Sequence, residues 1–95
     1  MPIQSFHDRW CERILKSEAP GKGFPSDLIA VTRRKLIALD EAVGLDQLRF
    51  PGGNGLEALK DDRAGQHAIR VNKQFRICFV WTEAGPTRVE FTDYH

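Results

Sequence analysis

The chain has 95 residues, of which 41% are hydrophobic and 28% are charged, and its formal net charge at pH 7 is +1. This size and composition predict one domain, residues 1–95, with a real hydrophobic core. So small a net charge excludes nucleic-acid binding driven by overall charge and leaves only local basic clusters. No apolar run approaches the roughly 18 residues of a membrane span, and the N-terminus lacks the pattern of a signal peptide. We therefore expect a cytosolic (cytoplasmic) protein that does not enter a membrane.

The cysteines and histidines fit no metal-binding pattern. Cys11 and Cys78 are 67 positions apart, and the three histidines, His7, His67 and His95, are equally scattered. This spacing predicts two buried thiols in a reducing compartment. We expect neither a metal nor another cofactor.

The first half of the chain has the patterns of a short strand and two helices. Residues 2–6 alternate loosely between apolar and polar side chains, as in a strand. Apolar residues recur at helical spacing after Asp8, a favourable N-cap, until the Gly- and Pro-rich segment 19–25 ends that helix. The second helix is predicted from the N-cap Ser26 to the C-cap Gly44. Its buried face is predicted to consist of Ile29, Thr32, Leu36, Leu39 and Val43.

The second half has the pattern of an antiparallel meander. Residues 51–55 form a turn or loop, which lacks the flanking strand and Lys-Ser/Thr of a phosphate-binding loop. Alternating apolar residues predict strands at 66–72, 74–82 and 87–94, with a tight turn at Asn72-Lys73. The predicted fold is therefore α+β in the order β-α-α-β-β-β, with a helical hairpin packed on one face of the sheet.

The other face of the predicted sheet is the place to look for function. Strand alternation assigns to it Arg70, Arg76, Arg88, Glu90 and Tyr94. A single arginine in a strand is usually solvated or paired with a carboxylate. A row of arginines suits the phosphates of a nucleic acid, because the guanidinium fork matches phosphate oxygens.

Three motifs in the second half resemble those of a bacterial toxin family. They read L-K-x-D-R-x-G-Q (59–66), I-R-V-N-x-x-F-R (69–76) and a terminal Asp-Tyr-His. Together they are similar to the HigB-like branch of the RelE/ParE superfamily, the toxins of type II toxin–antitoxin pairs. The resemblance implies a RelE-like fold and a ribosome-dependent, metal-independent endoribonuclease (an mRNA interferase) that cuts mRNA during translation.

The same resemblance implies specific partners. One is an antitoxin of the HigA-like, helix-turn-helix kind, whose complex with the toxin represses their own operon. The other is the ribosome with mRNA in its A site. Operator DNA would be contacted only through the antitoxin.

The implied reaction is attack by a ribose 2′-OH on the adjacent phosphate, which needs a base, an acid and cations that hold phosphate charge. By resemblance, Lys60 and Arg76 match the phosphate-stabilising positions, and Asp93, Tyr94 and His95 match the terminal catalytic group. We expect His95 to be the principal acid or base, Tyr94 to contact RNA and Asp93 to brace the site. The predicted RNA-binding residues are Lys60, Arg70, Lys73, Arg76 and Tyr94.

Two residues depart from the pattern of the family. Glu57 stands where many members have a functional histidine, and Asp61 stands where they have a glycine. A carboxylate with an ordinary pKa near ~4.3 is a weak base and repels RNA phosphates. We therefore expect weakened catalysis, with Glu57 at most orienting a neighbour. Arg63 matches a motif position that the pattern allows to be structural, paired with a carboxylate.

Two other functions remain open from the sequence. One is a ParE-like inhibitor that binds DNA gyrase without cutting RNA, which the Glu57 substitution favours and the terminal Asp-Tyr-His disfavours. The other is a weakly active toxin fold that serves as the corepressor of its antitoxin.

Overall fold

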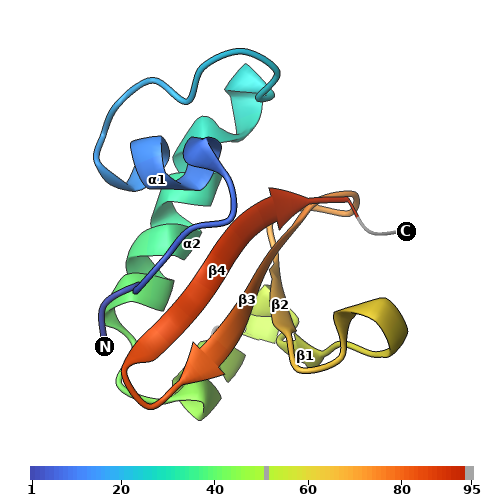
Figure 1. Ribbon diagram of the computed structural model, residues 1–95. Helices are drawn as coiled ribbons and strands as arrows, with labels where there is room; N and C mark the ends of the chain where they lie inside the picture. Colours follow the sequence, from blue (N-terminus) through green and yellow to red (C-terminus); the bar gives the residue numbers. More distant parts are fainter. Residues whose placement is uncertain (51, 94–95) are drawn as a thin grey trace.

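A computed structural model of the chain describes residues 1–50 and 52–93. In this part, two α-helices cover one face of a four-stranded antiparallel sheet in the order β1-β2-β3-β4 (Figure 1). The elements are α1 (Arg9–Leu15), α2 (Ile29–Glu41), β1 (Glu57–Ala58), β2 (His67–Arg70), β3 (Arg76–Thr82) and β4 (Gly85–Thr92). Neither helix has the length and hydropathy needed to cross a bilayer. The predicted α+β class, with a helical hairpin on an antiparallel sheet, is confirmed.

The core lies between the helices and the inner face of the sheet. Ile69, Ile77 and Phe91 lie directly opposite one another on β2, β3 and β4, and at most 5% of each is exposed. Ile14 of α1 and Leu36 of α2 belong to the same buried cluster. Burying each such side chain stabilises the fold by about 1.5–3 kcal/mol. This core face is the one that the alternating strand pattern predicted.

The second helix ends earlier than its apolar periodicity predicts. Helix α2 stops at Glu41, and Ala42 is extended, with ψ 135°. Ala42 is 1% exposed whereas Val43 is 78% exposed, so the prediction of a buried Val43 and a C-cap at Gly44 is wrong. Ala42 packs into the core instead, and its carbonyl accepts a 2.7 Å hydrogen bond from the N-terminal ammonium of Met1.

The N-terminal segment runs beside β4 without forming the predicted strand at residues 2–6. It makes one parallel bridge, between Phe6 and Val89. The amide of Val89 donates to the carbonyl of Ser5 (3.1 Å), and the amide of His7 donates to the carbonyl of Val89 (2.9 Å). These bonds fasten the segment along β4 (Figure 1).

A bulge in β4 changes which side chains share a face. Arg88 has a φ of 53°, in the left-handed region. Cys78 lies opposite Glu90, but Val80 lies opposite Thr87, so β4 carries one extra residue between these two pairs. Simple alternation, which assigned Arg88 to the outer face, therefore fails there. Thr87 and Glu90 share that face.

The connection between β2 and β3 is longer than the predicted two-residue turn at Asn72-Lys73. It spans five residues, and the amide of Val71 donates to the carbonyl of Phe75 at 3.0 Å. The side-chain oxygen of Asn72 accepts from the amides of Gln74 (2.9 Å) and Phe75 (2.7 Å). Asn72 thus determines the turn through its side chain, which shortens both neighbouring strands.

Candidate functional site

The two-residue strand β1 completes a row of side chains across the outer face of the sheet. Glu57 pairs with Ala68, Ala68 with Cys78 and Cys78 with Glu90. Directly opposite residues of an antiparallel pair point to the same face. The row therefore crosses all four strands on the face turned away from the helices, a span of about 14 Å.

The next row on this face holds two arginines. Arg70 lies directly opposite Arg76, which also pairs with Thr92. Among residues 1–50 and 52–93, no carboxylate forms an ion pair with either arginine. Opposite like charges destabilise a sheet by up to about 1 kcal/mol. An anion bound between the two guanidinium groups would remove that repulsion.

Arg76 is held in place by the loop before it. Its Nη1 donates to the carbonyl of Asn72 at 2.6 Å and to the carbonyl of Phe75 at 3.1 Å. These bonds leave the other guanidinium nitrogens for a ligand. Arg76 is half-buried while Arg70 is exposed, so the pair combines a fixed cation with an adaptable one.

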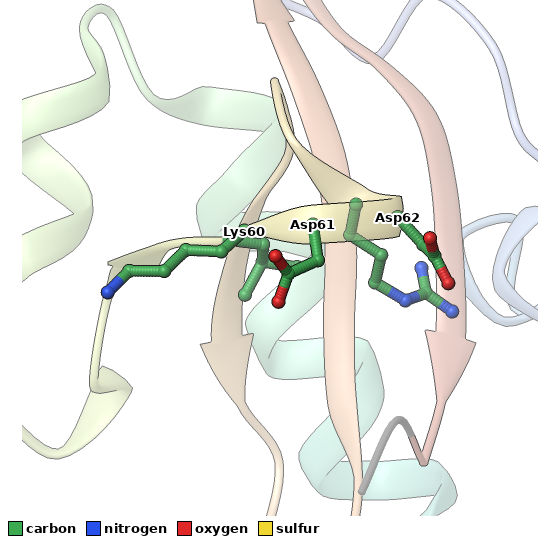
Figure 2. Close-up of a pocket in the computed structure, with 5 residues that line it drawn as sticks. Lys60, Asp61 and Asp62 are labelled. Carbon is green, nitrogen blue, oxygen red and sulfur yellow. The ribbon is translucent and has the colours of Figure 1, made fainter.

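The outer face is partly covered, contrary to the prediction. The short helix η4 (Asp61–Arg63) follows β1 and lies across the strands (Figure 2). From it, Arg63 Nη1 donates to Glu90 Oε1 at 2.7 Å and to Gln66 Oε1 at 3.1 Å. Since Glu90 is on the far edge strand, Arg63 spans the row above Cys78, which is 0% exposed. The predicted pairing of Arg63 with a carboxylate is confirmed.

Both cysteines are free and buried, as predicted. Burial raises the pKa of the Cys78 thiol to about 11, with the Glu90 and Glu57 carboxylates adding to the shift and Arg63 and Arg76 opposing it. Burial, followed by the charge of Asp8, raises the pKa of Cys11 as well. Both thiols are therefore protonated at neutral pH and are poor nucleophiles.

A hollow of about 360 Å³ adjoins η4. It is lined by Leu59, Lys60, Asp61, Asp62 and Arg63. The Lys60 side chain extends away from the two carboxylates (Figure 2). Asp61 has a φ of 56°, a backbone conformation that glycine adopts without strain. A glycine, which the resemblance to the family motif implies at this position, would adopt this backbone without strain.

Lys60 and the arginine pair lie toward different ends of the face. Strand β1 runs antiparallel to β2, with Glu57 opposite Ala68 and the amide of Leu59 donating to the carbonyl of Gln66. The chain from Glu57 to Lys60 therefore leads away from the row of Arg70. The predicted cations form two groups, with Glu57 between them.

The end of β4 is held at the β2–β3 loop. Asp93 is exposed, and its Oδ2 accepts a 3.2 Å hydrogen bond from Gln74 Nε2. The same loop carries the exposed Lys73 and leads into Arg76. Figure 1 shows the strand end beside this loop. The predicted site residues Tyr94 and His95 lie outside the described residues.

Sequence reasoning missed the part that His7 plays on this face. His7 Nε2 lies 3.6 Å from Glu90 Oε2, so Glu90 faces cationic or titratable groups on both sides. No local pattern could reveal this contact, because His7 and Glu90 are 83 positions apart. In the described ranges, no group of three or more His, Cys, Asp and Glu side chains is placed to hold a metal ion.

Comparison with known proteins covers both the helical hairpin and the sheet. The family model described as "RelE-like toxin of type II toxin-antitoxin system HigB" matches residues 4–95. Toxin HigB-1 of Vibrio cholerae is 37% identical over 78 residues, which is 82% of this chain and 82% of that protein. An uncharacterized protein of Haemophilus influenzae is 32% identical over 76 residues, which is 80% of this chain and 75% of that protein.

Proposed function

Because the chain belongs to the HigB-like family, the RelE-like toxins of type II toxin–antitoxin systems, we propose that it is a ribosome-dependent endoribonuclease that cuts mRNA during translation. Membership in the family makes it a toxin with an antitoxin partner. The observation that carries the nuclease proposal is the cross-strand pair of Arg70 and Arg76. Two adjacent cations without a described carboxylate partner suit the phosphate of an RNA chain.

The proposed reaction is metal-independent attack by a ribose 2′-OH on the adjacent phosphate. His95 transfers the proton, either from the attacking hydroxyl or to the leaving 5′-oxygen. Arg76, fixed by two carbonyls, and Arg70 hold the charge that develops on the phosphorane. Lys60 holds the RNA backbone at the η4 end of the face, and Tyr94 stacks on a base.

Three further residues tune the site in this proposal. Asp93 braces the strand end through Gln74, and Lys73 on the same loop contacts RNA phosphates. Glu57 lies in the row next to the arginines and lowers the local positive potential. The chain is therefore a weaker nuclease than relatives that carry a histidine at that position.

The antitoxin, in this proposal, is a helix-turn-helix protein of the HigA-like kind. It would bind operator DNA and carry the toxin to the operator. A gel-shift experiment tests this: the chain alone should not shift its operator, whereas the chain with its antitoxin should.

The test of the nuclease is cleavage of a defined mRNA by the purified chain with and without ribosomes, read by primer extension. Cleavage at codons is expected only with ribosomes. His95→Ala and Arg76→Ala should each lower the rate at least a hundredfold, whereas Arg49→Ala, which removes an exposed cation from η2 (Leu45–Arg49), should not.

Other outcomes identify the alternatives. Growth arrest with intact mRNA and trapped DNA gyrase would identify a ParE-like inhibitor instead of a nuclease. The carboxylate of Glu57 on the binding face favours this alternative. No arrest and no cleavage, with operon repression retained, would leave only the corepressor role.

A further inference from the structure

A second hollow, of about 280 Å³, lies between α1 and the loop that follows it. It is lined by Asp8, Arg9, Trp10, Arg13, Pro20 and Lys22. None of these residues belongs to the candidate site on the outer face. Three of the six are cations and one is an acid, so the hollow is positively charged.

The loop is fastened to α1, which preforms the hollow. Arg13 Nη1 donates to the carbonyl of Pro20 at 3.3 Å, and Trp10 Nε1 donates to the carbonyl of Lys22 at 3.1 Å. Gly21 has a φ of 96°, and a Cβ there would lie 2.6 Å from Arg13 Nη1. A side chain at Gly21 would therefore be strained and would displace Arg13.

The charge of the hollow is not neutralised internally. In the described part of the chain, no carboxylate forms an ion pair with Arg9, Arg13 or Lys22. The two oxygens of Asp8 accept from backbone amides, Oδ1 from Cys11 at 2.8 Å and Oδ2 from Phe91 at 2.7 Å. The acid is therefore engaged with the backbone, and the cations remain available to an external anion.

The hollow borders the end of β4. The hydrogen bond that the amide of Phe91 donates to Asp8 joins this strand, two residues before Asp93, to the start of α1. The ring centroids of Trp10 and Phe91 are 6.2 Å apart in an edge-on arrangement. Both the hollow, through Asp8, and the Arg70–Arg76 pair, through Thr92 opposite Arg76, are therefore connected to the C-terminal end of β4.

We propose that this hollow binds the phosphate backbone of RNA, as a contact additional to the cleavage site. Arginine forks match phosphate oxygens, and a basic surface beside an aromatic side chain is typical of sites for single-stranded nucleic acid. The inference rests on the proposed function for the nature of the ligand. The RNA is either the message or ribosomal RNA, which offer the same phosphates.

The test uses the double variant Arg9→Ala/Lys22→Ala. Both side chains are exposed, and the loop is fastened by the carbonyl of Lys22 rather than by its side chain. The matched control, Lys16→Ala/Arg49→Ala, removes the same charge from exposed ion pairs elsewhere. Binding to a labelled single-stranded RNA of about 12 nucleotides and to purified ribosomes is measured between 50 and 200 mM salt.

The double variant should bind roughly tenfold more weakly than the control, equally for two unrelated RNA sequences. The slope of log K against log salt should fall by about 1.4 for two lost single-strand phosphate contacts. A loss confined to the RNA arm identifies the message, and a loss confined to the ribosome arm identifies ribosomal RNA. Equal binding of variant and control in both arms would overturn the inference, as would loss of antitoxin binding with RNA binding intact.

These readouts are independent of cleavage. A chain that binds RNA through the hollow and leaves mRNA uncut would overturn the proposed nuclease and preserve this inference. If the parent chain cuts mRNA and the double variant binds RNA as tightly as the control, the proposed nuclease stands and this inference is overturned.

Discussion

Arg63 Nη1 lies 2.7 Å from Glu90 Oε1, and this ion pair ties the loop after β1 to the opposite edge strand of the sheet. The side chains are 27% and 18% exposed, so the pair is partly shielded from water. It closes over Cys78 and sets the position of η4, which carries one wall of the hollow around Lys60.

We expect a double-mutant cycle of Arg63→Met and Glu90→Gln to give a coupling energy of about 1–2 kcal/mol. The costs of the two single variants should add up to more than the cost of the double variant, because each single variant removes one member of this ion pair and keeps the charge of the other. Urea unfolding measures the free energy of unfolding of each variant, from which the coupling energy is calculated. The exposed Arg49–Asp46 pair is the control, with an expected coupling below about 0.5 kcal/mol. Equal coupling in the two cycles would contradict a structural role for Arg63–Glu90.

Asp61 combines a left-handed backbone with a negative charge beside Lys60. Asp61→Gly should stabilise the fold by about 0.5–1 kcal/mol, since glycine adopts this φ without strain. Asp61→Asn should leave stability nearly unchanged. Both variants should bind RNA more tightly than the parent, because both remove the charge. Tighter binding by the glycine variant alone would mean that the backbone, and not the charge, limits binding.

Asp8 fastens α1 to β4 by accepting from the amides of Cys11 and Phe91. Asp8→Ala removes the cap and leaves the Phe91 amide without this acceptor, so it should destabilise the fold by about 2–4 kcal/mol. Asp8→Asn keeps one acceptor oxygen and should cost about half as much. Thermal unfolding of the parent and the two variants tests whether alanine destabilises the fold more than asparagine does. If the alanine and asparagine variants lose the same stability, the hydrogen bond that asparagine retains contributes nothing.

The raised pKa of Cys78 makes stability depend on alkaline pH. Burial raises this pKa from an ordinary value of 9.0 to about 11, so the fold favours the neutral thiol. The stability that the fold gains from this preference is fully present below pH 9. It is lost as the pH rises from 9 to 11, at about 1.4 kcal/mol per pH unit. Cys78→Ala should unfold with a shallower pH dependence in this window. Parallel curves for variant and parent would refute the shift.

Variants of Glu57 test whether the glutamate at this position, where the family motif has a histidine, weakens cleavage. Glu57→His should raise the rate of ribosome-dependent cleavage, because a histidine has a pKa near neutrality and carries no negative charge. Glu57→Gln, which removes the charge and adds no titrating group, separates the two effects. A rate that rises equally in both variants would show that the carboxylate only repels the RNA.

For the candidate site, the sequence predicted the face of the sheet on which two arginines lie, but not how the side chains on that face are arranged. Alternation placed Arg70 and Arg76 on the outer face, and the register makes them direct neighbours. The same alternation failed at Arg88, because a bulge adds a residue there. Residues 57–58 were missed as a strand, since two residues carry no readable period.

The sequence alone determined those features of the fold that depend on residues close together in the chain. Apolar spacing identified the two helices and three of the four strands, Asp8 identified the start of α1, and the motifs identified the family. Only the tertiary structure decided which distant groups meet: Arg63 with Glu90, Met1 with Ala42, and Asp8 with Phe91. The physical reason is the distance along the chain between the residues that interact. Periodicity and capping depend on residues within a few positions, whereas these contacts exist only after packing of the core has brought separate segments together.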